Sequence, residues 1–251
     1  MATRVVVDAG HGGWDNGAMF NGRKEKDDNL NLALAVGDIL KNNGIDVVFT
    51  RTDDVYQSPN EKARIANRAN ADFFVSLHRN SSPEPNQYTG VQTLLYNDGD
   101  IKEVMADNIN QQLEQVGFKN LGRSIRKDLA VLRGTNMPAV LVETGFINND
   151  ADNQLFDREF DNIAQGIAQG ILTTIEQQMP VYRIQIGLFR NYDNAQRLAR
   201  RVEDLGYTVE IREINGYYAV LVGRFTQLDR AEQIQNILHQ DGFDTVVIAL
   251  R

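Results

Sequence analysis

The stretch Arg4-Val5-Val6-Val7-Asp8-Ala9-Gly10-His11-Gly12-Gly13 lies near the start of the sequence. β-branched residues are enriched in strands, so the valines predict a short first strand. The glycines predict a turn directly after it, and their lack of side chains leaves room for a ligand close to the backbone. The stretch therefore places a histidine in an open turn at the carboxyl end of a strand.

Further strands and helices follow in alternation. The helix after Ser58 is marked by a serine cap, by Pro59 at the first helical position and by Glu61 at the capping-box position. By composition and periodicity we expect strands at residues 46–50, 73–77, 91–96 and 139–143, and helices at residues 27–43, 59–69, 101–116 and 160–178. This alternation predicts an α/β fold, with a largely parallel sheet and helices on both of its faces.

Composition excludes several classes of protein. The net charge of −8 and the lack of a Lys/Arg run argue against a nucleic-acid binder. No apolar run approaches the length of a membrane span, and the N-terminal residues predict a strand rather than a secretory signal. Because the chain has no cysteine, disulfides, a thiolate nucleophile and cysteine zinc sites are excluded, and any metal must be held by His, Asp or Glu.

A second domain is predicted after residue 178. Residues 180–251 contain as many Arg as Asp and Glu together, so the whole negative charge belongs to residues 1–179. The junction is predicted at residues 176–180, where a helix ends at Pro180. We therefore expect one domain at residues 1–178 and a smaller one at residues 181–251.

The smaller domain contains an internal repeat with an offset of 36 residues. Tyr182-Arg183-Ile184-Gln185-Ile186-Gly187-Leu188-Phe189 aligns with Tyr218-Ala219-Val220-Leu221-Val222-Gly223-Arg224-Phe225. Each copy reads as strand, helix and strand, which predicts a ferredoxin-like α+β domain (βαββαβ) with both helices on one face of the sheet. Alternation places Arg183, Gln185, Tyr217 and Leu221 on the uncovered face. That face suits a sugar ligand, although a plain solvated sheet face has the same pattern.

Chemistry is expected at one edge of the larger sheet. His11 and His78 each follow a predicted strand, Glu143 ends a third, and Glu25 lies in the turn before the helix at residues 27–43. Carboxyl ends of parallel strands form the ligand crevice of an α/β sheet. Two histidines and a carboxylate are a common zinc shell, and a further carboxylate can act as the base. The pattern alone leaves open whether these histidines bind metal or are structural. The third, His239, reads as a surface residue.

Other hydrolytic and nucleotide-binding signatures are missing from the sequence. There is no Gly-x-Ser-x-Gly elbow and no phosphate-binding loop of the Gly-x-x-x-x-Gly-Lys-Ser/Thr type. The glycines around His11 do not have dinucleotide-binding spacing.

Four motifs in order span nearly all of residues 1–178. They are Asp8-Ala9-Gly10-His11-Gly12-Gly13-Trp14-Asp15-Asn16-Gly17-Ala18, Glu25-Lys26, Ser76-Leu77-His78-Arg79-Asn80 and Pro138-Ala139-Val140-Leu141-Val142-Glu143-Thr144-Gly145-Phe146-Ile147-Asn148-Asn149. Together they resemble the zinc-dependent N-acetylmuramoyl-L-alanine amidases of the Amidase_3 type. The resemblance implies one Zn2+ ion held by His11, Glu25 and His78, with Glu143 as the catalytic glutamate. Asn16, Leu77 and Arg79 depart from the family's usual residues, and none of them is at a ligand position.

Residues 181–251 resemble the SPOR family of peptidoglycan-binding domains, through the two copies of the repeat. The resemblance implies binding of glycan strands, above all strands without stem peptides, on the uncovered sheet face. Gln185 and Tyr217 are the candidate glycan contacts.

The two resemblances predict a hydrolase that cleaves the amide between N-acetylmuramic acid and L-alanine of the stem peptide and so degrades the cell wall. Peptidoglycan is the expected partner: a muropeptide at the first domain and a glycan strand at the second, with no nucleic acid and no membrane insertion. The alternatives are a non-catalytic peptidoglycan-binding protein and a zinc peptidase acting within the stem peptide. We expect synthesis in the cytoplasm without a signal peptide and release at phage lysis or mother-cell lysis. The sequence does not distinguish a phage endolysin from a host autolysin, and it does not define peptidoglycan chemotype, host range, oligomeric state or domain orientation.

Overall fold

A computed structural model describes residues 2–99, 101–178 and 180–250. The chain forms two compact units, Met1–Gln177 and Gln178–Arg251, and each is described by itself. The predicted junction at residues 176–180 includes Met179, which lies outside the described residues.

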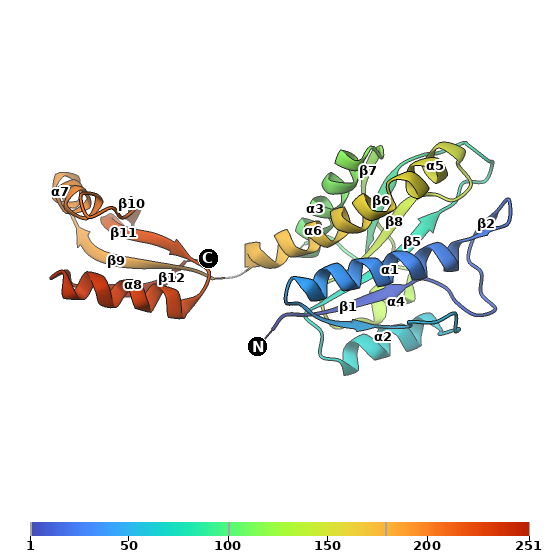
Figure 1. Cartoon of the computed structure of the whole chain (residues 1–251), viewed down its shortest axis with the longest axis horizontal. Helices are drawn as coiled ribbons and strands as arrows, with labels where there is room; N and C mark the ends of the chain where they lie inside the picture. The colour runs from blue at the N-terminus through green and yellow to red at the C-terminus, as the bar shows by residue number, and fades with distance from the viewer. Residues whose placement is uncertain (1, 100, 179, 251) are drawn as a thin grey trace. The chain divides into compact units, whose positions relative to one another are not determined.

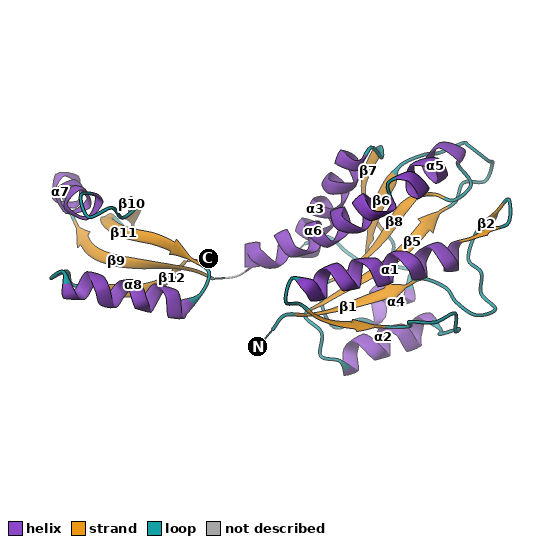
Figure 2. Cartoon of the chain, viewed as in Figure 1, coloured by secondary structure: helices purple, strands orange, loops and turns teal. Residues whose placement is uncertain are grey.

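The first unit is an α/β sandwich built on a six-stranded sheet (Figures 1 and 2). Its strands are β1 (Arg4–Ala9), β4 (Asp46–Phe49), β5 (Phe73–Asn80), β6 (Val91–Leu95), β7 (Asn120–Ile125) and β8 (Ala139–Phe146), in the order β4-β1-β5-β8-β6-β7. All neighbouring pairs are parallel except β6 and β8, which are antiparallel. The predicted fold class, a largely parallel sheet with helices on both faces, is confirmed.

Helices cover both faces of this sheet because its central strands are apolar on both. They are α1 (Glu25–Asn42), α2 (Pro59–Arg68), α3 (Ile101–Val116), α4 (Ala130–Gly134), α5 (Asp150–Arg158) and α6 (Phe160–Gln178). Val5 and Val7 point into a core closed by α1, α3 and α6, whereas Val6 between them points into a second core closed by α2 and α4. Alternation along one strand thus supplies both layers.

Several elements were not predicted or extend further than predicted. The short hairpin of β2 (Met19–Phe20) and β3 (Arg23–Lys24), the edge strand β7 and the helices α4 and α5 are additions. α1 begins at Glu25, so this residue is the first of the helix rather than part of the turn before it. β5 and β8 extend past the predicted ends, which places His78 and Glu143 inside their strands.

The second unit has the predicted ferredoxin-like arrangement. Its elements are β9 (Val181–Phe189), α7 (Tyr192–Glu203), β10 (Val209–Ile214), β11 (Tyr217–Phe225), α8 (Leu228–Gln240) and β12 (Val246–Leu250). The four strands form an antiparallel sheet in the order β10-β11-β9-β12. Ile184, Ile186, Val220 and Val222 form its core with residues of both helices, so the helices lie on one face as expected.

The uncovered face of this second sheet is less open than its polar pattern suggested. Leu221 lies there and is fully buried. Its cross-strand neighbours are Gln185 on β9 and Glu210 on β10, and long polar side chains can cover an apolar neighbour with their stems. Arg183 is also buried, donating to Glu210 and to the carbonyl of Gly223.

None of the helices in the described part of the chain is both long and apolar enough to cross a membrane.

Candidate metal centre

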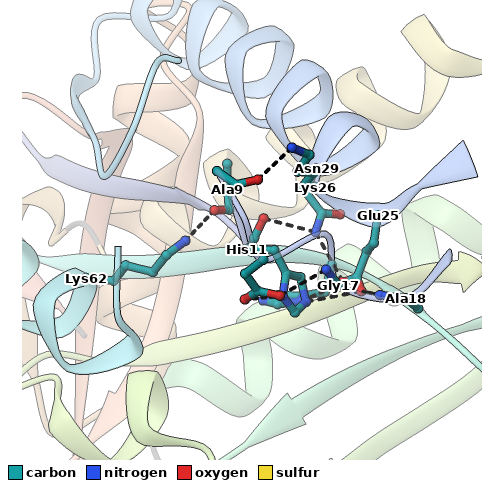
Figure 3. A network of polar contacts seen from close by, with 12 residues as sticks. Ala9, His11, Gly17, Ala18, Glu25, Lys26, Asn29 and Lys62 are labelled. Atoms are coloured by element: carbon teal, nitrogen blue, oxygen red, sulfur yellow. Dashed lines mark hydrogen bonds and ion pairs between the residues drawn. The ribbon is translucent and has the colours of Figure 1, made fainter. Parts of the chain in front are cut away.

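Three of the predicted site residues converge at the carboxyl edge of the first sheet. His11 follows β1, Glu25 begins α1 and His78 lies on β5; each offers one ligand atom, and these atoms lie within 4.8 Å of one another. Figure 3 shows His11 and Glu25 directed toward one another at the carboxyl end of β1. The sheet and the helix following its first strand therefore bring together side chains that are far apart in the sequence.

The carboxylate of Glu25 lies between the two imidazoles. Its Oε2 is 3.1 Å from His11 Nε2, and its Oε1 is 2.8 Å from His78 Nδ1. Ligand atoms around a tetrahedral zinc ion are separated by about 3.3 Å, given bonds of about 2.0–2.2 Å. The two contacts of Glu25 are close to that separation, and the three donor atoms, all within 4.8 Å of one another, leave one shared position between them. The residues present therefore fit a zinc ion.

Polar contacts outside the three donors hold them in place. Asp15 Oδ2 lies 2.9 Å from His11 Nδ1, on the side of the ring away from Glu25, as carboxylates commonly do behind metal-binding histidines. Glu25 accepts hydrogen bonds from the backbone N–H groups of Ala18 and Arg79 at 2.8 and 3.2 Å. The donor atoms of His11 and Glu25 are thus held in fixed directions.

The backbone around the centre is shaped for close approach. His11 has φ of 60°, a left-handed conformation that is uncommon for a residue with a side chain and that turns its ring back toward β5. A Cβ on Gly10 would lie 2.4 Å from the imidazole of His78, so only glycine allows that ring to pack on the end of β1. The two rings meet edge to face with centroids 5.0 Å apart.

Electrostatics at the centre follow from burial and close pairing. Burial alone would raise the pKa of Glu25, but its contacts with His11 and His78 outweigh this effect and lower it well below the usual range. For His11, burial opposes protonation, yet the contacts with Glu25 and Asp15 raise its pKa to about 9. Glu25 is therefore a charged carboxylate, and His11 keeps a proton until another cation takes the place beside Glu25.

The fourth predicted residue, Glu143, adjoins this group from the next strand. It lies opposite His78 in the parallel pairing of β5 and β8. Its Oε2 is buried and has no hydrogen-bond partner within the described ranges. Burial raises its pKa to about 7, with the nearby histidine His78 opposing the shift. A carboxyl group with this pKa can both accept and release a proton near neutral pH.

An ion pair not foreseen from the sequence supports the end of β1. Asp8 is fully buried, and its carboxylate accepts from Lys62 Nζ at 2.8 Å and from the hydroxyls of Thr50 and Ser76 at 2.6 Å. Lys62 also donates to the carbonyl of Ala9 (Figure 3). Burial would raise the pKa of Asp8, but Lys62 and the hydroxyls lower it. In the sequence, the one indication of this ion pair is Asp8 itself, an acidic residue at the end of a valine-rich strand.

A cavity of about 190 Å³ lies beside the two histidines. His11, His78 and Asp15 border it on one side, and apolar residues of the α4 region, including Leu129 and Val131, border it on the other. The cavity therefore opens onto two of the three predicted ligands, His11 and His78.

Residues 5–173 match the sequence profile of the family described as N-acetylmuramoyl-L-alanine amidase. The chain belongs to this family. Residues 179–249 match the SPOR domain profile. The predicted combination of an amidase with a SPOR domain is confirmed, and so is the predicted enzyme class.

Similar proteins include other amidases. The sporulation-specific N-acetylmuramoyl-L-alanine amidase of Bacillus subtilis is 36% identical over 214 residues, which cover 81% of this chain and 82% of that protein. The endolysin of Bacillus phage SPP1 is 39% identical over 181 residues, covering 68% of this chain and 65% of the endolysin. Among solved structures, the N-acetylmuramoyl-L-alanine amidase of Clostridium difficile 630 aligns with a TM-score of 0.67 and 34% identity, over 70% of this chain and 98% of that one.

Proposed function

We propose that this amidase hydrolyses the amide bond between the lactyl group of N-acetylmuramic acid and L-alanine of the stem peptide, with one zinc ion held by His11, Glu25 and His78. The observation that carries the proposal is the convergence of these three donors beside a buried, unpartnered glutamate oxygen. The names of the relatives support the choice of bond.

Zinc suits a site of two imidazole nitrogens and one carboxylate oxygen, and three protein ligands leave a further position open. When bound, zinc supplies Lewis acidity, which polarises a carbonyl group and lowers the pKa of water. Asp15 keeps the ring of His11 oriented, and the backbone N–H groups that bond to Glu25 keep its oxygens directed at the shared position.

Glu143 is proposed as the general base and acid. Its Oε2 has no competing partner, so the oxygen is free to accept a proton from the attacking water. The same atom then delivers the proton to the nitrogen of the departing L-alanine. Because burial raises its pKa to about 7, both the carboxylate that accepts a proton and the acid that releases it are accessible near neutral pH.

The second unit is proposed to bind glycan strands on its uncovered sheet face, with Gln185 and Tyr217 as contacts. Both side chains are half-buried there. Arg190 donates to the hydroxyl of Tyr217 at 3.2 Å, which holds the ring in one orientation. We therefore propose that the first unit acts on the muropeptide and that the second unit binds the glycan strand.

We also propose that the enzyme reaches the cell wall after lysis of the cell that made it, through a phage or through a mother cell. The relatives include both a phage endolysin and a sporulation-specific amidase. Either route delivers a wall hydrolase to its substrate.

The test is digestion of purified peptidoglycan followed by mass spectrometry of the soluble products. We expect intact stem peptides with a free L-alanine amino group, activity that a chelator removes and zinc restores, and about one zinc per chain by elemental analysis. His78→Ala should lose both metal and activity. Peptides cut internally would instead identify a peptidase, and undiminished activity after chelation would exclude the zinc site.

A further inference from the structure

Two exposed aromatic rings stack beside the candidate metal centre. The ring centroids of Trp14 and Tyr56 are 4.2 Å apart, and their planes are inclined by 31°. Trp14 is 75% exposed and Tyr56 39% exposed, although aromatic side chains are usually covered. We refer to this pair as the aromatic platform. Neither ring has been used in the fold or the proposed reaction.

The platform adjoins the cavity of the proposed active site. Asp15 and Gln57 both line the cavity, together with His11 and His78. Asp15 directly follows Trp14 in the sequence, and Gln57 directly follows Tyr56. Adjacent Cα atoms are about 3.8 Å apart, so each ring is attached within one residue of the cavity wall. A ligand that fills the cavity therefore lies close to the two residues that carry the rings.

The loops that carry the two rings are fixed to each other. Gly13 N donates to Asp54 Oδ1 at 2.8 Å, and Lys26 Nζ bridges the Gly13 carbonyl and Asp54 Oδ2 at 2.7 and 2.6 Å. A Cβ on Gly13 would lie 2.7 Å from the backbone nitrogen of Tyr56, and its φ of 60° favours glycine. Arg51, which is buried, ties the same two loops through the carbonyls of Gly10 and Asp53.

These contacts fix the backbone of the two loops, which limits the positions that the two rings can take. A surface that is already ordered loses little conformational entropy on binding, which is why preorganised aromatic residues make strong contacts. An isolated flexible surface tryptophan would have none of these supports.

The chemistry of the platform suits a flat, uncharged ligand. Its two rings form an apolar surface, and the nearest acidic side chains along the chain, Asp15 and Asp54, are each paired with a basic group, His11 and Lys26. In the intact substrate the lactyl group of muramic acid is part of the amide, so the pyranose ring that carries it bears no charge. The C–H face of such a ring is flat and apolar enough to lie on an aromatic ring.

We propose that Trp14 and Tyr56 form a glycan-binding subsite of the catalytic unit, which stacks on a pyranose ring of the strand whose peptide is being cleaved. This inference rests on the proposed amidase function. It adds a second glycan contact to the one expected of the C-terminal unit and places it next to the reacting bond.

Trp14 is the only tryptophan of the chain, so its fluorescence reports on the platform alone. The experiment titrates the full-length protein with a tetrasaccharide of N-acetylglucosamine, which has the same pyranose rings without lactyl carboxylates, under selective excitation of tryptophan. We expect a saturable change in intensity and emission wavelength. The free stem peptide, added as the second probe, should cause none. A response to the peptide and not to the tetrasaccharide, or no response to either, would overturn the proposal.

Kinetics provide an independent readout. With a tetrasaccharide that carries stem peptides as substrate, Trp14→Ala should raise KM about tenfold, equal to about 1.4 kcal/mol, with kcat and zinc content unchanged. Trp14→Phe should keep most of the affinity, because it retains an aromatic face. Tyr192→Ala, which removes a ring that is 48% exposed on α7 of the other unit, is the matched control and should leave KM unchanged. An unchanged KM in Trp14→Ala would contradict the proposal.

The two proposals can fail separately. If the protein releases stem peptides but Trp14 does not respond to glycan, the subsite is wrong and the amidase function stands. If Trp14 responds to glycan but no peptide with a free L-alanine amino group is released, the subsite stands and the proposed reaction is wrong.

Discussion

Glu143 and His78 occupy directly opposed positions on the neighbouring parallel strands β8 and β5. Side chains opposed in this way share one face of the sheet, so the rigid sheet, and not a mobile loop, sets the position of the proposed base relative to a proposed ligand. Glu25 completes the arrangement from the first turn of α1. The geometry of the site is therefore a direct consequence of strand order.

Replacement Glu143→Gln should reduce kcat by about 10²–10⁴-fold, the usual contribution of a positioned general acid or base. The amide has nearly the same shape as the carboxyl group, so the fold should persist, and zinc binding by the other three residues should be unaffected. Peptide release from purified peptidoglycan and elemental analysis measure the two effects. Near-normal turnover in this variant would show that Glu143 is not the base.

The pH dependence of activity should contain an acid limb that belongs to Glu143. Burial raises the pKa of this carboxyl group to about 7, so the protonated, inactive form accumulates as the pH falls. A bound cation lowers the pKa of a nearby acid, so the limb in the zinc enzyme should lie at or below that value. We expect kcat/KM to rise with pH and to reach a plateau above neutrality. The residual activity of Glu143→Gln should lack this limb, and a limb of the same position in both proteins would assign it to another group.

Stability should depend on the buried pair of Asp8 and Lys62. Asp8→Asn leaves the ammonium group of Lys62 buried without its counter-ion, and breaking such a pair typically costs about 3–5 kcal/mol. The double variant Asp8→Asn with Lys62→Met removes both charges and should recover part of this loss. Urea unfolding of the single and double variants measures the coupling, and additive losses would show that the two charges do not interact.

The buried pair of Asp8 and Lys62 also predicts how the free energy of unfolding changes in acid. The pKa of Asp8 in the folded protein lies below its ordinary value of 3.8, so its contribution to stability is present above that pH and is lost as the pH falls through the folded-state pKa. The difference in unfolding free energy between the wild type and Asp8→Asn should therefore shrink in acid. A difference that stays constant down to low pH would contradict the assigned shift.

Much of this architecture could be predicted from sequence because its signals are local. Ser58 caps α2 by accepting from the N–H of Glu61, as its spacing from Pro59 and Glu61 indicated. The apolar periodicity of residues 101–116 and 160–178 matches α3 and α6 at both ends. Valine-rich runs identified the central strands, and parallel topology then implied that the residues following them share one edge.

The remaining features depend on contacts between distant segments. β7 lies at the edge of the sheet beside β6, where its side chains are less buried, so its sequence has little apolar pattern. α5 is short and mostly polar. The burial of Leu221 depends on side chains of two neighbouring strands. Likewise, Trp14 and Tyr56 lie 42 positions apart in the sequence, and contacts of Lys26, Arg51 and Asp54 between distant segments bring their loops together.

The uncovered face of the second unit supplies the last prediction. Gln185→Ala and Tyr217→Ala should each weaken binding of the full-length protein to peptide-free glycan strands, by about 3- to 10-fold for the loss of one hydrogen bond or ring contact. Cleavage of a small soluble muropeptide should be unchanged, because that substrate is proposed to occupy only the first unit. Co-sedimentation with glycan strands and a soluble-substrate assay separate the two effects.

Gln233→Ala is the control for this pair of variants, because Gln233 is exposed on α8, which packs on the other face of the sheet. It should bind glycan strands as the wild type does.

Arg190 lies over the ring of Tyr217 at 5.5 Å and donates to its hydroxyl. Arg190→Ala should therefore free the ring and produce a smaller loss of glycan binding than Tyr217→Ala. Equal losses in Gln233→Ala and Gln185→Ala would place the glycan elsewhere on this unit, and a loss of muropeptide cleavage in Tyr217→Ala would show that the two units do not act on separate parts of the substrate.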